Sequence, residues 1–311
     1  MLTIWRFMDG NRAHEKQSAA LVSGLRAVLG ADQLVCCDLN CDEVRLPLWR
    51  KAPPSLAQLP IPDFILGAGH RTHWPVVRAR SLFGGRSVVI MQPSLPLAWF
   101  DFAVIPEHDR PPPLQNVILT RGALAEPLPD LPPEPDRALL LLGGPSKHFH
   151  WDAAKVSAVT SRLLLRPRRW IVSDSRRTPP DTLAQCAGNG IELHAWQACP
   201  EGWLAEQMAR AGEIWVTGDS VSMIFEALQS RAPVGVIPMP SRHPRNKIRS
   251  ALDRLLDEGL VTDRIAEEVP GAVPHTPALR KPLAQEVLCA QALLRRSGWA
   301  AAQVALPGAA Q

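Results

Sequence analysis

Short apolar runs alternate with longer amphipathic segments along the first part of the chain. Residues 4–8 have the composition of a β-strand, residues 14–29 carry apolar positions at helical spacing, and residues 33–39 predict a second strand. The same pattern predicts strands at residues 64–68, 87–91, 102–105 and 116–120, and a helix at residues 72–82. Repeated strand–helix units of this kind predict a mostly parallel sheet.

The alternation restarts at residue 137, where an unbroken run of leucines predicts a strand that is buried on both faces. Further strands are expected at residues 169–174, 191–195, 213–217 and 234–238, and helices at residues 152–165, 180–187, 201–211 and 222–231. The second half of the chain therefore repeats the architecture of the first. We expect an α/β fold with two Rossmann-like domains that face a cleft.

The segment between the two halves is rich in proline, which resists both helix and sheet and suits a semi-rigid connector. We therefore expect an N-terminal domain over residues 1–126, a linker over 127–136 and a C-terminal domain over 137–278. Residues 279–311 are expected to form a last helix, which packs on the first domain, and a frayed tail. A length of 311 residues also favours two domains over one.

Composition and charge exclude several classes of protein. No apolar run approaches the ~20 residues of a membrane-spanning helix, and the first residues lack the order of a signal peptide, so a cytoplasmic location is expected. The net charge of +4 is spread along the chain, so nucleic acid is not an expected partner. Basic stretches at residues 162–169, 176–177 and 242–254 are either solvated helix ends or contacts for phosphates and anionic lipids.

Six cysteines are too few for a disulfide scaffold in a chain of this length. Cys36, Cys37 and Cys41 have no matching cluster of cysteine or histidine elsewhere in the sequence. We therefore favour reduced thiols over a zinc site at these positions.

Candidate chemistry lies in the loops that follow the predicted strands, because ligands of open α/β sheets bind at the carboxyl ends of the strands. After the first strand come Asp9, Gly10 and His14. Gly10 permits a tight turn, and His14 is either a general base or orienting donor, or a simple cap of the following helix. Asp9 is the second candidate catalytic residue.

The third predicted strand ends in Gly69, His70 and Arg71. The glycine lets backbone amides face a ligand, and the neighbouring charges favour substrate contact. His70 and His73 could share a metal, but no carboxylate or cysteine accompanies them at ligand spacing, and we expect no metal.

Two segments of the second half are candidates for binding phosphate. Gly143, Gly144 and Ser146 follow the leucine-rich strand, although their spacing matches neither a Walker loop nor a dinucleotide fingerprint. The strand at residues 213–217 runs into a helix start that offers cap side chains and free amides for a diphosphate. Its candidate donor-binding residues are Thr217, Gly218, Asp219, Ser220, Ser222, Met223 and Glu226. Glu226, two turns along the expected helix, is either a ligand of the donor ribose or a buried structural carboxylate.

These segments carry a resemblance to a known family. The runs DFILGAGHRTH, FDFAVIPEHD, NVILTRGAL, LLLLGG and VTGDSVSMIFEAL resemble the mitochondrial fission "elongated mitochondria" proteins of plants and many bacteria, from residue 4 to about residue 260. That family resembles glycosyltransferase-B enzymes, which bind a nucleotide sugar in the C-terminal domain and the acceptor in the N-terminal one, without a required metal. The resemblance assigns Glu226 to the donor ribose and His14 to the acceptor, although this chain lacks the double glycine that precedes the histidine in better-known members.

Two hypotheses follow for the function. The first is a nucleotide-sugar-dependent glycosyltransferase that acts on a glycan or glycolipid acceptor in bacterial envelope or lipopolysaccharide-core assembly, with no cofactor besides the donor and with peripheral contact to the inner membrane. The departing diphosphate would be stabilised by helix amides, Ser220, Ser222 and Arg71 or Lys247. The second is a non-catalytic adaptor that keeps the fold and recruits a partner. An epimerase is disfavoured because the chain has no tyrosine and no dinucleotide fingerprint.

Overall fold

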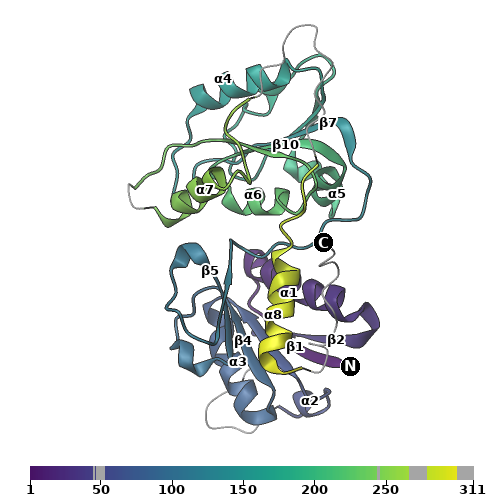
Figure 1. Ribbon diagram of the computed structural model, residues 1–311, viewed down its shortest axis with the longest axis vertical. Coiled ribbons are helices and arrows are strands. Elements are labelled where there is room, and N and C mark those ends of the chain that lie inside the picture. The colour runs from purple at the N-terminus through teal and green to yellow at the C-terminus, as the bar shows by residue number, and fades with distance from the viewer. Residues whose placement is uncertain (45, 47–52, 244–245, 266–278, 300–311) are drawn as a thin grey trace, which may run out of the picture. The chain divides into compact units, whose positions relative to one another are not determined.

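The protein folds into two compact units (Figure 1). A computed structural model describes residues 1–44, 46, 53–243, 246–265 and 279–299. Unit 1 contains Met1–Pro127 and Ala284–Gln311, and unit 2 contains Leu128–Leu283. The last part of the chain therefore belongs to the same unit as the first.

Unit 1 is built on a parallel sheet with the strand order β2-β1-β3-β4-β5-β6. Its strands are β1 (Leu2–Met8), β2 (Leu34–Asn40), β3 (Phe64–Ala68), β4 (Arg86–Ile90), β5 (Phe102–Pro106) and β6 (Val117–Thr120). Its helices are α1 (Arg12–Leu29), α2 (Pro54–Ala57), α3 (His70–Phe83) and α8 (Gln285–Ser297). Alternate residues of the strands point to opposite faces, and each face packs a separate apolar core.

Helix α8 lies beside α1 in Figure 1 and is fixed to unit 1 at both ends. Gln285 accepts a hydrogen bond from the backbone amide of Arg121 at 2.9 Å, and Arg296 donates to the carbonyl of Val117 at 2.7 Å. The two helices approach so closely that a Cβ atom on Gly24 would lie 2.2 Å from the carbonyl oxygen of Glu286. Only glycine permits this contact.

Unit 2 is built on a second parallel sheet, with the strand order β11-β10-β7-β8-β9. Its strands are β7 (Glu134–Leu141), β8 (Arg169–Ser173), β9 (Glu192–His194), β10 (Ala211–Thr217) and β11 (Val234–Ile237). Its helices are α4 (Ala153–Leu164), α5 (Trp203–Arg210), α6 (Val221–Ala227) and α7 (Lys247–Asp257). Figure 1 shows α4 on one face of the sheet and α5 and α6 on the other. The expected α/β fold of two Rossmann-like parallel sheets is confirmed.

Several predicted elements differ from the structure for local reasons. The helix expected at residues 180–187 is only a 3-10 turn, Ala184–Cys186, because Pro179 and Pro180 precede it and Asp181 has a positive φ of 66°. The helix expected at residues 222–231 ends at Ala227. Strand β7 begins inside the proline-rich segment, at Glu134, and α2 and α7 have no counterpart in the sequence prediction.

The last helix begins at Gln285 rather than at residue 279, because Pro282 and the left-handed Ala284 (φ 46°) precede it. The frayed tail expected at residues 304–311 lies outside the described residues.

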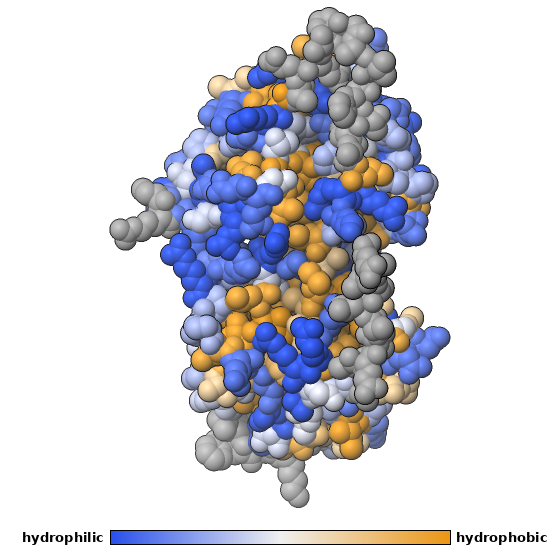
Figure 2. All heavy atoms as spheres, in the orientation of Figure 1, coloured by the Kyte–Doolittle hydropathy of each residue, from blue (hydrophilic) through white to orange (hydrophobic). Residues whose placement is uncertain are grey.

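No helix within the described ranges combines the length and the apolar character that crossing a bilayer requires. Large apolar side chains such as Trp99 and Leu165 are exposed. Figure 2 shows hydrophobic surface between hydrophilic side chains in both units. Such exposure is common on folded proteins and does not by itself indicate a function.

Candidate active site and nucleotide site

Each sheet has a topological switch point, where consecutive loops leave its carboxyl edge in opposite directions and ligands of α/β proteins gather. In unit 1 the switch point lies between the adjacent strands β1 and β3, because the chain passes from β1 to β2 on one side and returns to β3 on the other. In unit 2 it lies between β7 and β10 for the same reason. The candidate residues of the sequence follow these four strands.

At the switch point of unit 1, Asp9 and His14 form a hydrogen-bonded pair. Nδ1 of His14 lies 2.8 Å from Oδ2 of Asp9, whose side chain is only 3% exposed, whereas that of His14 is 24% exposed. The other oxygen of Asp9 accepts from the backbone amide of Asn11 at 3.0 Å. A carboxylate in this position holds the proton on Nδ1 and leaves Nε2 as the acceptor. His14 does not cap α1, because the side chain of Asn11 does so.

Gly69 closes over this pair. A Cβ atom at Gly69 would lie 2.1 Å from Nδ1 of His14 and 2.8 Å from Oδ2 of Asp9, and φ at this position is +86°. Arg71 donates to the carbonyl of Asp9 at 2.9 Å and pairs with Asp42. The structure thus brings Asp9, His14, Gly69 and Arg71 together. Gly10 has a positive φ of 78° in the turn, and its backbone amide donates a hydrogen bond to the side chain of Glu15 at 2.9 Å.

His70 and His73 differ sharply in their surroundings. His70 is exposed, whereas His73 is 3% exposed, with Nδ1 3.1 Å from Oγ of Ser94 and 3.4 Å from its backbone nitrogen. Burial, and then repulsion by His70 and His14, lowers the pKa of His73 to about 4. Among the described residues, no group of three or more His, Cys, Asp or Glu side chains could hold a metal ion.

Because of the lowered pKa of His73, we expect the folded protein to become less stable in weak acid. The pKa of this histidine is about 4 in the folded protein and near 6.5 in the unfolded chain, so the unfolded chain binds the proton more readily. The free energy of unfolding should fall as pH drops from 6.5 to 4, by up to about 3 kcal/mol from this group. We expect His73→Asn, whose amide oxygen can accept from Ser94, to flatten this part of the pH profile in urea denaturation. An unchanged profile would contradict the assignment.

At the switch point of unit 2, one buried carboxylate joins the loops after β7 and β10. The side chain of Asp219 is 0% exposed and accepts from the backbone amide of Gly144 at 2.9 Å, and the hydroxyl of Thr217 accepts from the amide of Gly143 at 2.7 Å. Burial raises the pKa of Asp219, and the Gly144 amide, Thr217 and Arg177 oppose the rise. A Cβ atom at Gly143 would lie 2.4 Å from the carboxylate.

Arg177, which follows β8, completes this cluster. Its guanidinium lies 3.0 Å from Oδ2 of Asp219 and donates to the carbonyls of Gly144 at 2.7 Å and Pro145 at 3.2 Å. The side chain remains 37% exposed. In the sequence this arginine stands out only as part of a basic pair, although its position after the strand next to β7 is a usable signal.

The start of α6 differs from the sequence prediction. Ser220 is its N-cap residue, but no side chain caps the helix, because the carboxylate of Asp219 is turned toward Gly144 and Arg177 instead. Glu226 lies in the last turn of this short helix and is half-buried, not buried. Ser222 is exposed and Met223 half-buried, and Ser222 shares a helix face with Glu226 at i, i+4 spacing.

The remaining expected donor contacts are Ser146, Lys247 and Gly218. The hydroxyl of Ser146 accepts from the amides of His148 at 3.2 Å and Phe149 at 3.1 Å, which closes its own loop. Lys247 begins α7 after the cap residue Asn246. The backbone amide of Gly218 donates a hydrogen bond to the carbonyl of Ile237 at 2.8 Å, which fixes the end of β10 to β11.

Two parallel Rossmann-like sheets, each with a polar cluster at its switch point, define a two-unit α/β protein. The chain belongs to the family described as Mitochondrial fission ELM1, which matches residues 13–297. The resemblance found in the sequence is thereby confirmed. No curated protein matches the chain.

Solved structures of similar fold include glycosyltransferases and related proteins. Acinetobacter baumannii MurG is 13% identical, with a TM-score of 0.47, and the match covers 97% of this chain and 95% of that one. The MnaA–UDP structure of S. aureus is 13% identical, with a TM-score of 0.46, and the match covers 84% of this chain and 89% of that one. E. coli heptosyltransferase WaaC with ADP is 11% identical, with a TM-score of 0.43, and the match covers 83% of this chain and 100% of that one.

Proposed function

We propose that this protein is a glycosyltransferase that moves a sugar from a nucleotide donor to a hydroxyl group of an acceptor. The observation that carries the proposal is the Asp9–His14 pair at the switch point of unit 1. A buried carboxylate orients a partly exposed imidazole so that Nε2 can accept a proton. This arrangement supports activation of a hydroxyl nucleophile.

In the proposed reaction, Nε2 of His14 takes the proton of the acceptor hydroxyl as its oxygen attacks the anomeric carbon of the sugar. The bond between that carbon and the nucleoside diphosphate breaks, and the diphosphate leaves with the bonding electrons. The departing anion needs positive groups around it. Arg177 and the first-turn amides of α6, which have no partner within the helix, are the groups of unit 2 that we assign to this task.

The donor site in this proposal lies at the switch point of unit 2. The loop at Gly143 and Gly144 packs against Asp219 and the backbone of Arg177, and the guanidinium of Arg177 donates to the Gly144 carbonyl. Ser222 and Glu226 follow on one face of α6, where a carboxylate can accept hydrogen bonds from ribose hydroxyls. Because arginine and amides supply the positive charge, we expect nucleotide binding to persist in the presence of EDTA.

Glu226→Gln tests the donor site. The glutamine keeps the shape and loses charge-assisted hydrogen bonds worth about 1.5–3 kcal/mol, so the affinity for nucleoside diphosphates should fall by about ten- to a hundredfold. Calorimetry and melting shifts with uridine and adenosine diphosphates measure this. Glu201→Gln, which makes the same charge change at an exposed position of unit 2, should leave the affinity unchanged. If the parent binds no nucleoside diphosphate at millimolar concentration, the donor site is wrong.

The acceptor in this proposal is a glycan or glycolipid of the bacterial envelope, including the lipopolysaccharide core. A glycolipid acceptor would bring the protein to the inner membrane from the cytoplasmic side. Mass spectrometry of envelope glycans from a strain that lacks the gene tests this part. A missing sugar residue is the expected result, and an unchanged glycan profile speaks against an envelope acceptor.

A second candidate function is a non-catalytic adaptor, and one observation favours it. The carboxylate of Asp219 already accepts a hydrogen bond from the amide of Gly144 and pairs with Arg177. It therefore competes with a phosphate for the same donors. An adaptor would bind no nucleotide and would tolerate replacement of His14 and Glu226. The calorimetry described above therefore separates the two functions.

A further inference from the structure

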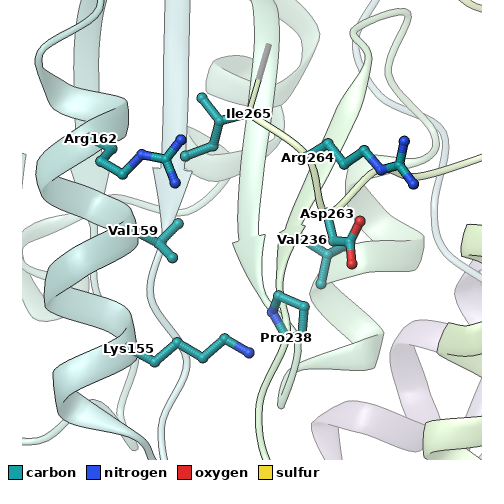
Figure 3. A pocket seen from close by; sticks show the side chains of 8 residues that line it. All are labelled: Lys155, Val159, Arg162, Val236, Pro238, Asp263, Arg264 and Ile265. Carbon is teal, nitrogen blue, oxygen red and sulfur yellow. The ribbon is translucent and has the colours of Figure 1, made fainter. Parts of the chain in front are cut away.

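Unit 2 contains a surface cavity of about 350 Å³ that no residue of either switch-point cluster lines. It lies between α4 and the edge strand β11, as Figure 3 shows. Its lining residues are Lys155, Val159, Arg162, Val236, Pro238, Asp263, Arg264 and Ile265. A cavity of this size falls in the range that holds small organic ligands.

The charges around the cavity are unbalanced. Lys155, Arg162 and Arg264 line it, together with the single carboxylate of Asp263. All four charged residues are exposed, and within the described part of the chain their side chains form no ion pair or hydrogen bond with one another or with neighbouring residues. Figure 3 shows Lys155 and Arg162 extending from α4 toward the strand side, whereas Arg264 extends away from the helix. An anion between the first two cations would reduce their mutual repulsion.

The wall between these cations is apolar. Val159 stands on the same face of α4 as Lys155 and Arg162, which are two helical turns or about 10 Å apart. Val236 is fully buried beneath the cavity, and Pro238 and Ile265 are partly exposed to it. A bare inorganic ion would leave this wall in contact with water. A ligand with an apolar body would cover it.

We infer that this cavity binds a small organic phosphate, with its phosphate group held by Lys155 and Arg162 and its apolar or aromatic body on Val159, Val236, Pro238 and Ile265. The inference is independent of the proposed transferase activity, because none of these residues belongs to either switch-point cluster. Phosphate fits the pair of cations better than a single carboxylate, since it carries close to two negative charges at neutral pH and three acceptor oxygens.

Phenyl phosphate is the probe, titrated calorimetrically at low salt into the full chain. We expect saturable binding, at least about tenfold weaker binding of inorganic phosphate, and a loss of about tenfold or more in Lys155→Ala/Arg162→Ala. Arg86→Gln removes one exposed positive charge from unit 1 and should bind phenyl phosphate as the parent does. Melting temperatures of all variants establish that each one folds.

Three results would overturn the inference. The first is the absence of binding to the parent at ~10 mM phenyl phosphate, a concentration that detects even weak sites. The second is equal affinity for inorganic and phenyl phosphate, which would mean that the apolar wall takes no part. The third comes from vesicles that contain phosphatidylserine: if they bind through Lys155 and Arg162 while phenyl phosphate does not, this face contacts a membrane surface instead.

Discussion

Replacement of His14 by asparagine is expected to lower the rate of sugar transfer by about a thousandfold, within the range assigned to a general base. The amide nitrogen of asparagine can take the place of Nδ1 and keep the hydrogen bond to Asp9, so the loop keeps its geometry. What disappears is Nε2, the group that accepts the proton. The affinity for the nucleotide should not change, because His14 belongs to unit 1 and the proposed donor site to unit 2.

The measurement is kcat and KM with the donor that nucleotide-sugar screening identifies. Asp9→Asn should also reduce kcat strongly, because an amide no longer fixes the proton on Nδ1 of His14. His150→Asn replaces an exposed histidine of unit 2 and serves as the control, with activity like that of the parent. Full activity in His14→Asn would remove the observation on which the transferase proposal rests.

Most of the fold could be predicted because buried parallel strands leave a strong signal in the sequence. The run of leucines before Gly143 gave the central strand of unit 2, and residues 64–68 gave β3 with its bounds as observed. The misses involve local backbone effects. Proline at positions 179 and 180 prevents the helix that the apolar spacing of the following residues indicates. Helix α7 was a plain omission, because its buried Ala251, Leu252 and Leu255 stand at helical spacing and could have been recognised in the sequence.

The candidate site was only partly predictable, because sequence order shows which loops leave a sheet edge but not which side chains meet there. Asp9 and His14 are neighbours in sequence and could be paired by inspection. The contact between Asp219 and Gly144 joins residues 75 positions apart, and Arg177 reaches both from a third loop. An aspartate just before a helix is usually a cap, and only the fold shows that this one turns back to the glycine loop.

The close packing of that loop makes Gly144→Ala the most disruptive glycine-to-alanine substitution that we expect in unit 2. A Cβ atom at this position would lie 1.9 Å from the carbonyl oxygen of Arg177 and 2.8 Å from the backbone nitrogen of Thr178. Both are backbone atoms, so the loop after β8 must move as a whole. That shift would break the hydrogen bond from Arg177 to the Gly144 carbonyl. It would also weaken the hydrogen bond from the Gly144 backbone amide to the carboxylate of Asp219.

Overpacking of this kind typically destabilises a protein by about 1–3 kcal/mol, and a buried carboxylate that loses a donor adds about 1–3 kcal/mol. We therefore expect Gly144→Ala to lower the free energy of unfolding by roughly 2–6 kcal/mol in urea denaturation. Gly188→Ala is the matched control, because its Cβ atom would meet only the flexible end of Ile191, at 2.7 Å from Cδ1. A small loss in Gly144→Ala, equal to that in Gly188→Ala, would mean that the loops after β7 and β8 are not packed as described. Where the variant still folds, nucleotide binding should be lost with it, because the loop shift displaces Arg177 from the site.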